Sequence, residues 1–166
     1  MSKKKPRPIP VPVEGLSALV DAHTHLASHP DSDADVVSRA EAAGVGRIVT
    51  VGDDIEESAA ALSAAHAFAD VYAACAIHPV RAGQLDDSAK ERLRKMTADP
   101  RCVAIGETGL DAYWIEHAPE ATADMDTQEE ALRWHIDLAV ESAKTLMIHN
   151  READEALLRI LAESPQ

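Results

Sequence analysis

The segment Val103-Ala104-Ile105-Gly106-Glu107-Thr108-Gly109-Leu110-Asp111 decides the fold class of this chain. An apolar run, Val103 to Gly106, leads directly into the carboxylate of Glu107. A continuous apolar run without polar alternation is typical of a strand buried on both faces of a parallel sheet. The segment therefore predicts a parallel α/β fold in which a polar group follows the end of a buried strand.

The same arrangement recurs along the chain, because short apolar runs alternate with longer amphipathic segments. This alternation is the signature of successive parallel β-α-β units. We therefore expect one α/β domain with five strands, over Ala18–Ala22, Arg47–Val51, Val71–Ile77, Val103–Gly106 and Thr145–Ile148.

Helix starts are predicted at Ser88-x-x-Glu91 and Thr127-x-x-Glu130, which match the capping box. The segment Ile115–Asp126 lacks helical periodicity and contains a proline, so we expect a loop there. After the second cap, apolar residues at three- and four-residue spacing predict one stripe that packs on the sheet, formed by Leu132, Ile136, Ala139 and Ala143.

Composition separates residues 1–15, a Pro- and Lys-rich segment expected to be a flexible tail, from residues 16–166, which read as one unit. A net charge of -13 argues against binding nucleic acid through the general field of the protein. No apolar run is long enough for a membrane span or a signal peptide, so we expect no membrane partner and a cytoplasmic location. Cys75 and Cys102 lie in apolar runs and are expected to be buried free thiols.

Histidines follow the predicted strands. In Asp21-Ala22-His23-Thr24-His25 the period of two places His23 and His25 on one face, which suits one metal ion, although such a pair also occurs for ordinary hydrogen bonding. His149 and His78 follow the fifth and third strands in the same way. The other histidines fall in helical segments or loops, where surface or core roles are expected; they are His29, His66, His117 and His135.

Glu107 after the fourth strand needs a partner if it is buried, and a metal ion, a salt bridge or a helix cap would each supply one. Histidine and carboxylate ligands suit divalent ions such as Zn²⁺ and Mn²⁺. A carboxylate can also bridge two ions, and two ions about 3.5–4 Å apart can act together on a phosphate ester.

Four segments in this order and spacing resemble the TatD-type metal-dependent hydrolases: Asp21-Ala22-His23-Thr24-His25, Ala76-Ile77-His78-Pro79, Gly106-Glu107-Thr108-Gly109-Leu110-Asp111 and Ile148-His149-Asn150-Arg151. The resemblance runs from about Leu16 to the end, and four linked motifs are far more specific than one.

This resemblance implies a TIM-like β/α barrel and a deoxyribonuclease or phosphodiesterase activity that uses a metal-activated water and two ions, Mg²⁺, Mn²⁺ or Zn²⁺. By the same resemblance, His23 and His25 hold one ion, the catalytic Glu107 bridges to the second, and His149 ligates that second ion. Three further residues match positions near the metals or along the substrate site, and the resemblance implies that they bind the substrate: His78, Asp111 and Arg151.

The family continues beyond the point that corresponds to Gln166, and its later part supplies a further histidine and aspartate. We therefore expect the N-terminal part of a barrel, whose open sheet edge at Thr145–Ile148 is unpaired or pairs with a C-terminal part or a second copy. Two alternatives stay open. One is a related barrel hydrolase acting on an amide, lactone or other ester, and the other is a truncated, non-catalytic fragment or interaction module.

Overall fold

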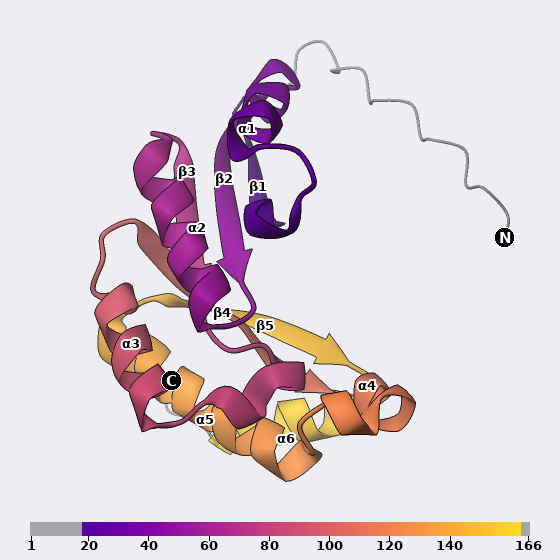
Figure 1. Cartoon of the computed structure of the whole chain (residues 1–166). Helices are drawn as coiled ribbons and strands as arrows, with labels where there is room; N and C mark the ends of the chain where they lie inside the picture. The colour runs from indigo at the N-terminus through magenta and orange to yellow at the C-terminus, as the bar shows by residue number, and fades with distance from the viewer. Residues whose placement is uncertain (1–17, 164–166) are drawn as a thin grey trace, which may run out of the picture.

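The computed structural model describes residues 18–163, which contain five strands in one parallel sheet of order β1-β2-β3-β4-β5 (Figure 1). Each strand pairs in parallel with the next one along the chain. The predicted α/β class with five strands is confirmed, whereas the predicted tail at residues 1–15 lies outside the described range. The strands are β1 (Leu19–Thr24), β2 (Val45–Gly52), β3 (Val71–Cys75), β4 (Cys102–Asp111) and β5 (Thr145–Arg151).

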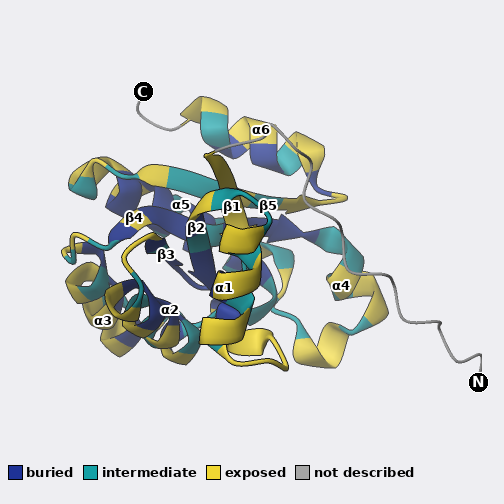
Figure 2. Ribbon diagram, turned by 90° about the horizontal axis from the view of Figure 1, so that it is seen from above, coloured by how far each residue is buried: buried dark blue, intermediate teal, exposed yellow. Residues whose placement is uncertain are grey.

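Helices connect the strands and cover one side of the curved sheet (Figures 1 and 2). They are α1 (Asp33–Ala42), α2 (Ile55–Ala67), α3 (Asp87–Thr97), α4 (Ala112–His117), α5 (Met125–Ser142) and α6 (Asp154–Glu163), with 3-10 turns η1 (Leu26–Ser28), η2 (Pro79–Gln84) and η3 (Pro119–Ala121). Among residues 18–163, no helix has the length and apolar character needed to cross a bilayer.

The main core lies between the sheet and these helices, where Val71, Leu93 and Ile105 are fully buried. Cys75 and Cys102 are buried free thiols in this core, as predicted. The predicted stripe of α5 is buried at Leu132, Ile136 and Ala139, while Ala143 caps the end of the helix in a left-handed conformation with φ 52°.

Strands β4 and β5 are longer than predicted, and their extra length positions the site. Both continue past their apolar runs, so that Glu107, Asp111 and His149 lie within paired strands rather than after them. Gly109 makes this possible because it pairs with His149 and adopts φ 152°, and a Cβ atom on it would lie 1.9 Å from the carbonyl oxygen of His149.

The predicted helix caps were placed too late along the chain. Asp86 caps α3 and Asp124 caps α5, each accepting a hydrogen bond from a backbone N–H three residues on. A carboxylate at this position also interacts favourably with the positive end of the helix dipole, which explains the earlier starts. The predicted loop Ile115–Asp126 is wrong in part, because it contains the end of α4, all of η3 and the start of α5.

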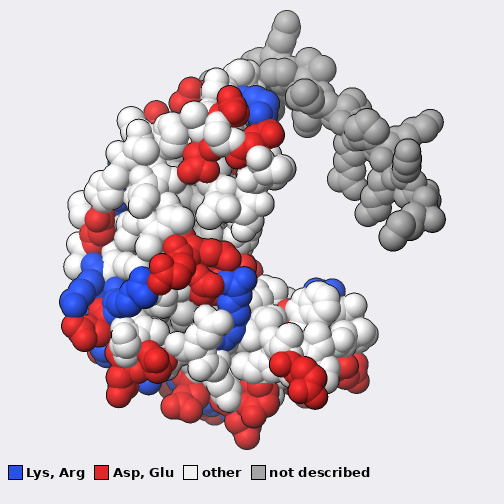
Figure 3. All heavy atoms as spheres, in the orientation of Figure 1, with Lys and Arg blue, Asp and Glu red and all other residues white. Residues whose placement is uncertain are grey.

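The sheet has two open edges within the described part of the chain, β1 and β5. Val20 on β1 is 57% exposed and Ile148 on β5 is 38% exposed. The molecule has the outline of a letter C, hollowed between these two regions (Figure 3). The prediction that β5 is a sheet edge is confirmed for residues 18–163.

Candidate metal centre

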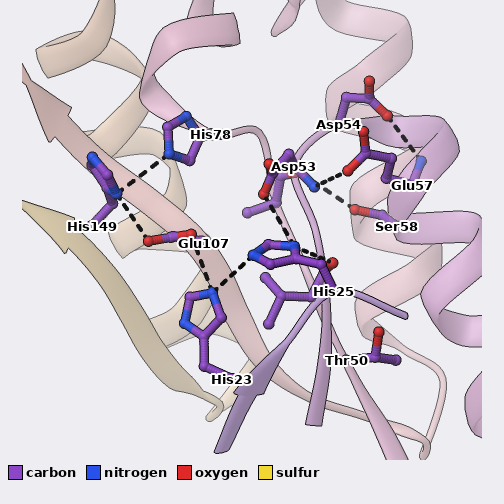
Figure 4. A network of polar contacts seen from close by, with 12 residues as sticks. His23, His25, Thr50, Asp53, Asp54, Glu57, Ser58, His78, Glu107 and His149 are labelled. Atoms are coloured by element: carbon purple, nitrogen blue, oxygen red, sulfur yellow. Dashed lines mark hydrogen bonds and ion pairs between the residues drawn. The ribbon is translucent and has the colours of Figure 1, made fainter. Parts of the chain in front are cut away.

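Five side chains from separate elements point toward one another at the carboxyl ends of the strands (Figure 4). His23 belongs to β1 and His25 follows it, Glu107 lies in β4, and His149 lies in β5. His78 comes after β3, where it caps η2. The structure therefore brings together the four predicted ligands and places His78 beside them.

The first group of donor atoms consists of His23, His25 and Glu107, which could together hold a metal ion. His23 Nε2 lies 3.2 Å from His25 Nε2 and 3.3 Å from Glu107 Oε2. His25 Nδ1 lies 3.1 Å from the carbonyl oxygen of Val51, to which it must donate its proton. The lone pair of His25 is therefore on Nε2, which faces His23.

The second group consists of Glu107, His149 and His78, and it shares Glu107 with the first. His149 Nδ1 lies 2.9 Å from Glu107 Oε1 and 3.3 Å from His78 Nε2. The two oxygens of Glu107 thus face different histidines, Oε2 toward His23 and Oε1 toward His149. A carboxylate in this position can serve two ions.

The electrostatics of these groups reflect their close contact. Burial alone would raise the pKa of Glu107, but the hydrogen bond from His149 and the nearby imidazoles lower it below its usual value. Burial tends to lower the pKa of His149, yet its hydrogen bonds to Glu107 and Asp111 raise it overall. The pKa of His78 is lowered, first by burial and then by the charge of His149. Without a metal, these contacts favour the protonated form of His149 and the ionised form of Glu107.

Asp111 contacts His149 on the side of the ring opposite Glu107. Its side chain is fully buried, and Oδ2 lies 2.9 Å from His149 Nε2. Oδ1 accepts a hydrogen bond of 2.8 Å from the backbone N–H of Trp114, and Gln128 Oε1 accepts one from the backbone N–H of Asp111 itself. Asp111 thus orients the imidazole so that Nδ1 faces Glu107.

Arg151 ends β5, two residues beyond His149, and is exposed. Its guanidinium carbon lies 3.7 Å from the ring centroid of Tyr113 on α4. The structure thus places Arg151 at the rim of the site, stacked on an aromatic ring.

The four histidines expected to lie elsewhere are all outside the cluster. His135 is fully buried, and its Nε2 accepts a hydrogen bond from the backbone N–H of Ile77 while Nδ1 contacts the carbonyl oxygen of Ala131. His66 pairs with Asp99 on the surface. His29 and His117 are exposed.

Sequence reasoning missed Asp53 and Glu57, which form a third possible donor group with His25. Asp53 Oδ1 is buried, lies 3.7 Å from His25 Nδ1, and has no hydrogen-bond partner among residues 18–163. Asp53 directly follows the paired residues of β2, and this position was the signal that could have found it. Glu57 lies one turn along α2, where it is also paired with Arg81.

The donor set fits divalent cations. Imidazole nitrogens and carboxylate oxygens are the ligands that Zn²⁺ and Mn²⁺ take in proteins, and Mg²⁺ favours the carboxylates. Cations at this position would satisfy the oxygen of Asp53 that lacks a hydrogen-bond partner, and four imidazoles lie close enough to Glu107 to share them. The residues present therefore suit a metal centre with Glu107 in its middle.

The parallel sheet and the histidine–carboxylate cluster at its carboxyl edge define an α/β protein of the half-barrel type with a candidate metal centre. The family model described as "TatD related DNase" matches residues 20–166. The chain belongs to the TatD family.

Relatives with curated names agree with this assignment. The chain is 48% identical over 147 residues to a protein of Mycobacterium tuberculosis named "Uncharacterized metal-dependent hydrolase TatD", covering 86% of this chain and 55% of the relative. It is 33% identical over 132 residues to the "3'-5' ssDNA/RNA exonuclease TatD" of Cronobacter turicensis, covering 79% of this chain and 48% of the relative. The chain thus spans about half the length of the curated relatives it matches.

Among solved structures, the crystal structure of YJJV, a TatD homologue from Escherichia coli K12, superposes with a TM-score of 0.76 at 27% identity. The match covers 87% of this chain and 55% of that one. The five strands therefore correspond to about half of a TIM-like barrel, which confirms the predicted fold class.

Proposed function

We propose that this chain carries the metal-binding part of a hydrolase that cleaves phosphodiester bonds in single-stranded nucleic acid. One observation supports the proposal above all others: Glu107 lies between two groups of imidazoles and turns one carboxylate oxygen toward each. That arrangement suits a pair of cations, and paired cations are typical of phosphodiester hydrolysis. The names of the exonuclease relatives point to the same substrate class.

In this proposal His23 and His25 would hold one ion, His149 would hold the second, and Glu107 would serve both. When bound, such ions supply Lewis acidity that activates a water molecule and balances the charge of the phosphate. His78, inside the second donor group, and Arg151, at the rim, contact the substrate. Because Asp111 is fully buried, it acts on the substrate site through His149 and not by direct contact. A cytoplasmic location remains a prediction.

The decisive experiment compares substrates on the protein as its gene encodes it, loaded with Mn²⁺, Mg²⁺ or Zn²⁺. We expect shortening of 5'-labelled single-stranded DNA and cleavage of a nitrophenyl phosphodiester, and both activities should disappear in chelator. A protein that opens a lactone but leaves both phosphodiesters intact would overturn the proposal in favour of the related ester or amide hydrolases.

Metal titration of residues 1–166 tests the remaining alternative, a non-catalytic fragment. We expect binding of close to two ions per chain by calorimetry, because the five clustered donors are already assembled in this part. A chain that stays monomeric and binds almost no metal would favour the fragment or interaction module, and light scattering reports the size.

A further inference from the structure

Beside the metal centre, α4 carries a group of aromatic rings that the proposed chemistry does not use, and Arg151 at the end of β5 lies against them. Aromatic residues make up only 3% of the chain, yet Tyr113 and Trp114 are consecutive here. Their ring centroids lie 5.1 Å apart in an edge arrangement. None of the residues of α4 is buried, all of them being described, so these rings do not serve the core.

Tyr113 is enclosed between two planar groups. The guanidinium carbon of Arg151 lies 3.7 Å from its centroid, and the ring of His117 stacks on it at 3.9 Å with an interplanar angle of 12°. Two planar groups cannot share one face of a ring at these distances, so Arg151 and His117 take opposite faces. Both faces of the Tyr113 ring are therefore occupied. The cation–π contact with Tyr113 holds the guanidinium of Arg151 in place against the ring.

Trp114 is the ring that remains available. It is 40% exposed, and the guanidinium carbon of Arg151 lies 5.4 Å from its centroid. An exposed indole next to a positioned guanidinium offers a stacking face and a phosphate donor side by side.

The position of α4 relative to the metal centre is set by one buried carboxylate. Asp111 bonds the backbone of Trp114 through Oδ1 and the ring of His149 through Oδ2. Arg151 pairs with Asp111 in the sheet, and the period of two places it on the same face of β5 as His149. Figure 1 shows α4 at the tip of β5, where this face of the sheet ends.

We propose that Trp114 is the stacking surface for an unpaired nucleobase of the substrate, and that Arg151, held by Tyr113, binds the adjacent phosphate. This inference rests on the proposed function and names the residues that would select a single strand, since bases in a duplex offer no free face for stacking. Such a contact would also offset the unfavourable net charge of -13 when a polyanion binds. Base stacking supplies sequence-tolerant affinity that does not depend on a basic surface.

A thermodynamic cycle between side chain and base tests this assignment. Binding is measured by fluorescence anisotropy, in chelator to prevent cleavage, with labelled oligothymidylate and with an abasic oligomer of equal length and charge. We expect Trp114→Ala to weaken oligothymidylate binding by about fivefold or more and to leave abasic binding unchanged. Trp134→Phe, a change at the partly buried tryptophan of the core, is the matched control and should alter neither.

Fluorescence gives a second readout. In the Trp134→Phe background Trp114 is the only indole, and stacking of thymine on it should quench its emission, whereas the abasic oligomer should not. Equal weakening of both oligomers by Trp114→Ala, absence of quenching, or absence of oligothymidylate binding by the unaltered chain would overturn the stacking role. If Trp114→Ala weakens only oligothymidylate binding but the protein cleaves no phosphodiester, the stacking role is supported and the proposed hydrolase activity is overturned.

Discussion

The two halves of the candidate metal centre use the same ligand types but are supported very differently. On β4 and β5, the side chains of Glu107 and His149 are 14% and 20% exposed, and the supporting Asp111 is fully buried. On β1, the side chain of His23 is 37% exposed. Both halves include an edge strand of the sheet, β1 or β5. The β4–β5 half differs because a buried carboxylate holds its histidine before any ion arrives.

The two halves differ in the number of polar contacts that hold their histidines in place. His149 reaches its position through Asp111, Gln128 and the close approach of Gly109, a set that spans β4, β5 and α5. His25 relies on one contact with the carbonyl oxygen of Val51 and a longer one with Asp53. Changes in the β4–β5 half should therefore be the more damaging ones.

The largest expected effect is that of Glu107→Gln on hydrolysis by the protein as its gene encodes it. We expect the rate on single-stranded DNA to fall at least about a hundredfold with the fold retained, because an amide is a poor bridging ligand. His66→Gln, a change at an exposed histidine outside the site, should have little effect. Equal losses in both variants would indicate global damage and remove the special role of Glu107.

The pH dependence of stability tests the role of His135, which is buried beside β4 and contacts Thr108. Burial lowers the pKa of His135 to about 4, against about 6.5 in the unfolded chain. The neutral ring therefore stabilises the fold fully above the unfolded value, and this contribution is lost as the pH falls toward the folded one. Between about pH 7 and about pH 5 the free energy of unfolding should drop by about 2 kcal/mol.

The matched variant for this measurement is His135→Gln, followed by urea unfolding across the same range. Its pH dependence should be flatter than that of the unaltered chain, whatever its absolute stability. The comparison is needed because the raised pKa of His149 gives the metal-free chain an opposite trend, adding stability at low pH that is lost as the pH rises. Identical slopes would show that His135 is not the buried neutral group.

Asp111→Asn should weaken metal binding although Asp111 belongs to neither donor group. Loss of the carboxylate removes the charge that orients His149, and changes to such supporting partners cost about tenfold or more in metal affinity. Calorimetric titration with Zn²⁺ measures the effect. Asp31→Asn, at an exposed aspartate paired with Arg39, removes the same charge elsewhere and should leave the affinity unaltered.

The smallest effect should come from His23→Ala on the stability of the metal-free chain. His23 lies on an exposed edge strand, so the free energy of unfolding should change by no more than about 0.5 kcal/mol. In the same assay, His149→Ala leaves the buried carboxylate of Asp111 without its imidazole and should cost about 1–3 kcal/mol. A larger loss for His23→Ala than for His149→Ala would reverse the comparison between the two halves.

The sequence by itself determined the number and order of the strands and the identity of four of the clustered side chains. Continuous apolar runs show where parallel strands are buried, and parallel strands bring the residues at their carboxyl ends to one edge. His23, His25, Glu107 and His149 could therefore be predicted to meet from their positions alone.

Tertiary structure decided what surrounds those side chains. The extension of β4 through Gly109, the burial of Asp111 and the enclosure of Tyr113 each depend on a partner distant in the chain, which no local pattern reports. Helix starts at Asp86 and Asp124 depended on which of several polar residues reached a free backbone N–H. Local sequence thus determines which groups arrive at the site, and long-range packing determines which atom of each group faces inward.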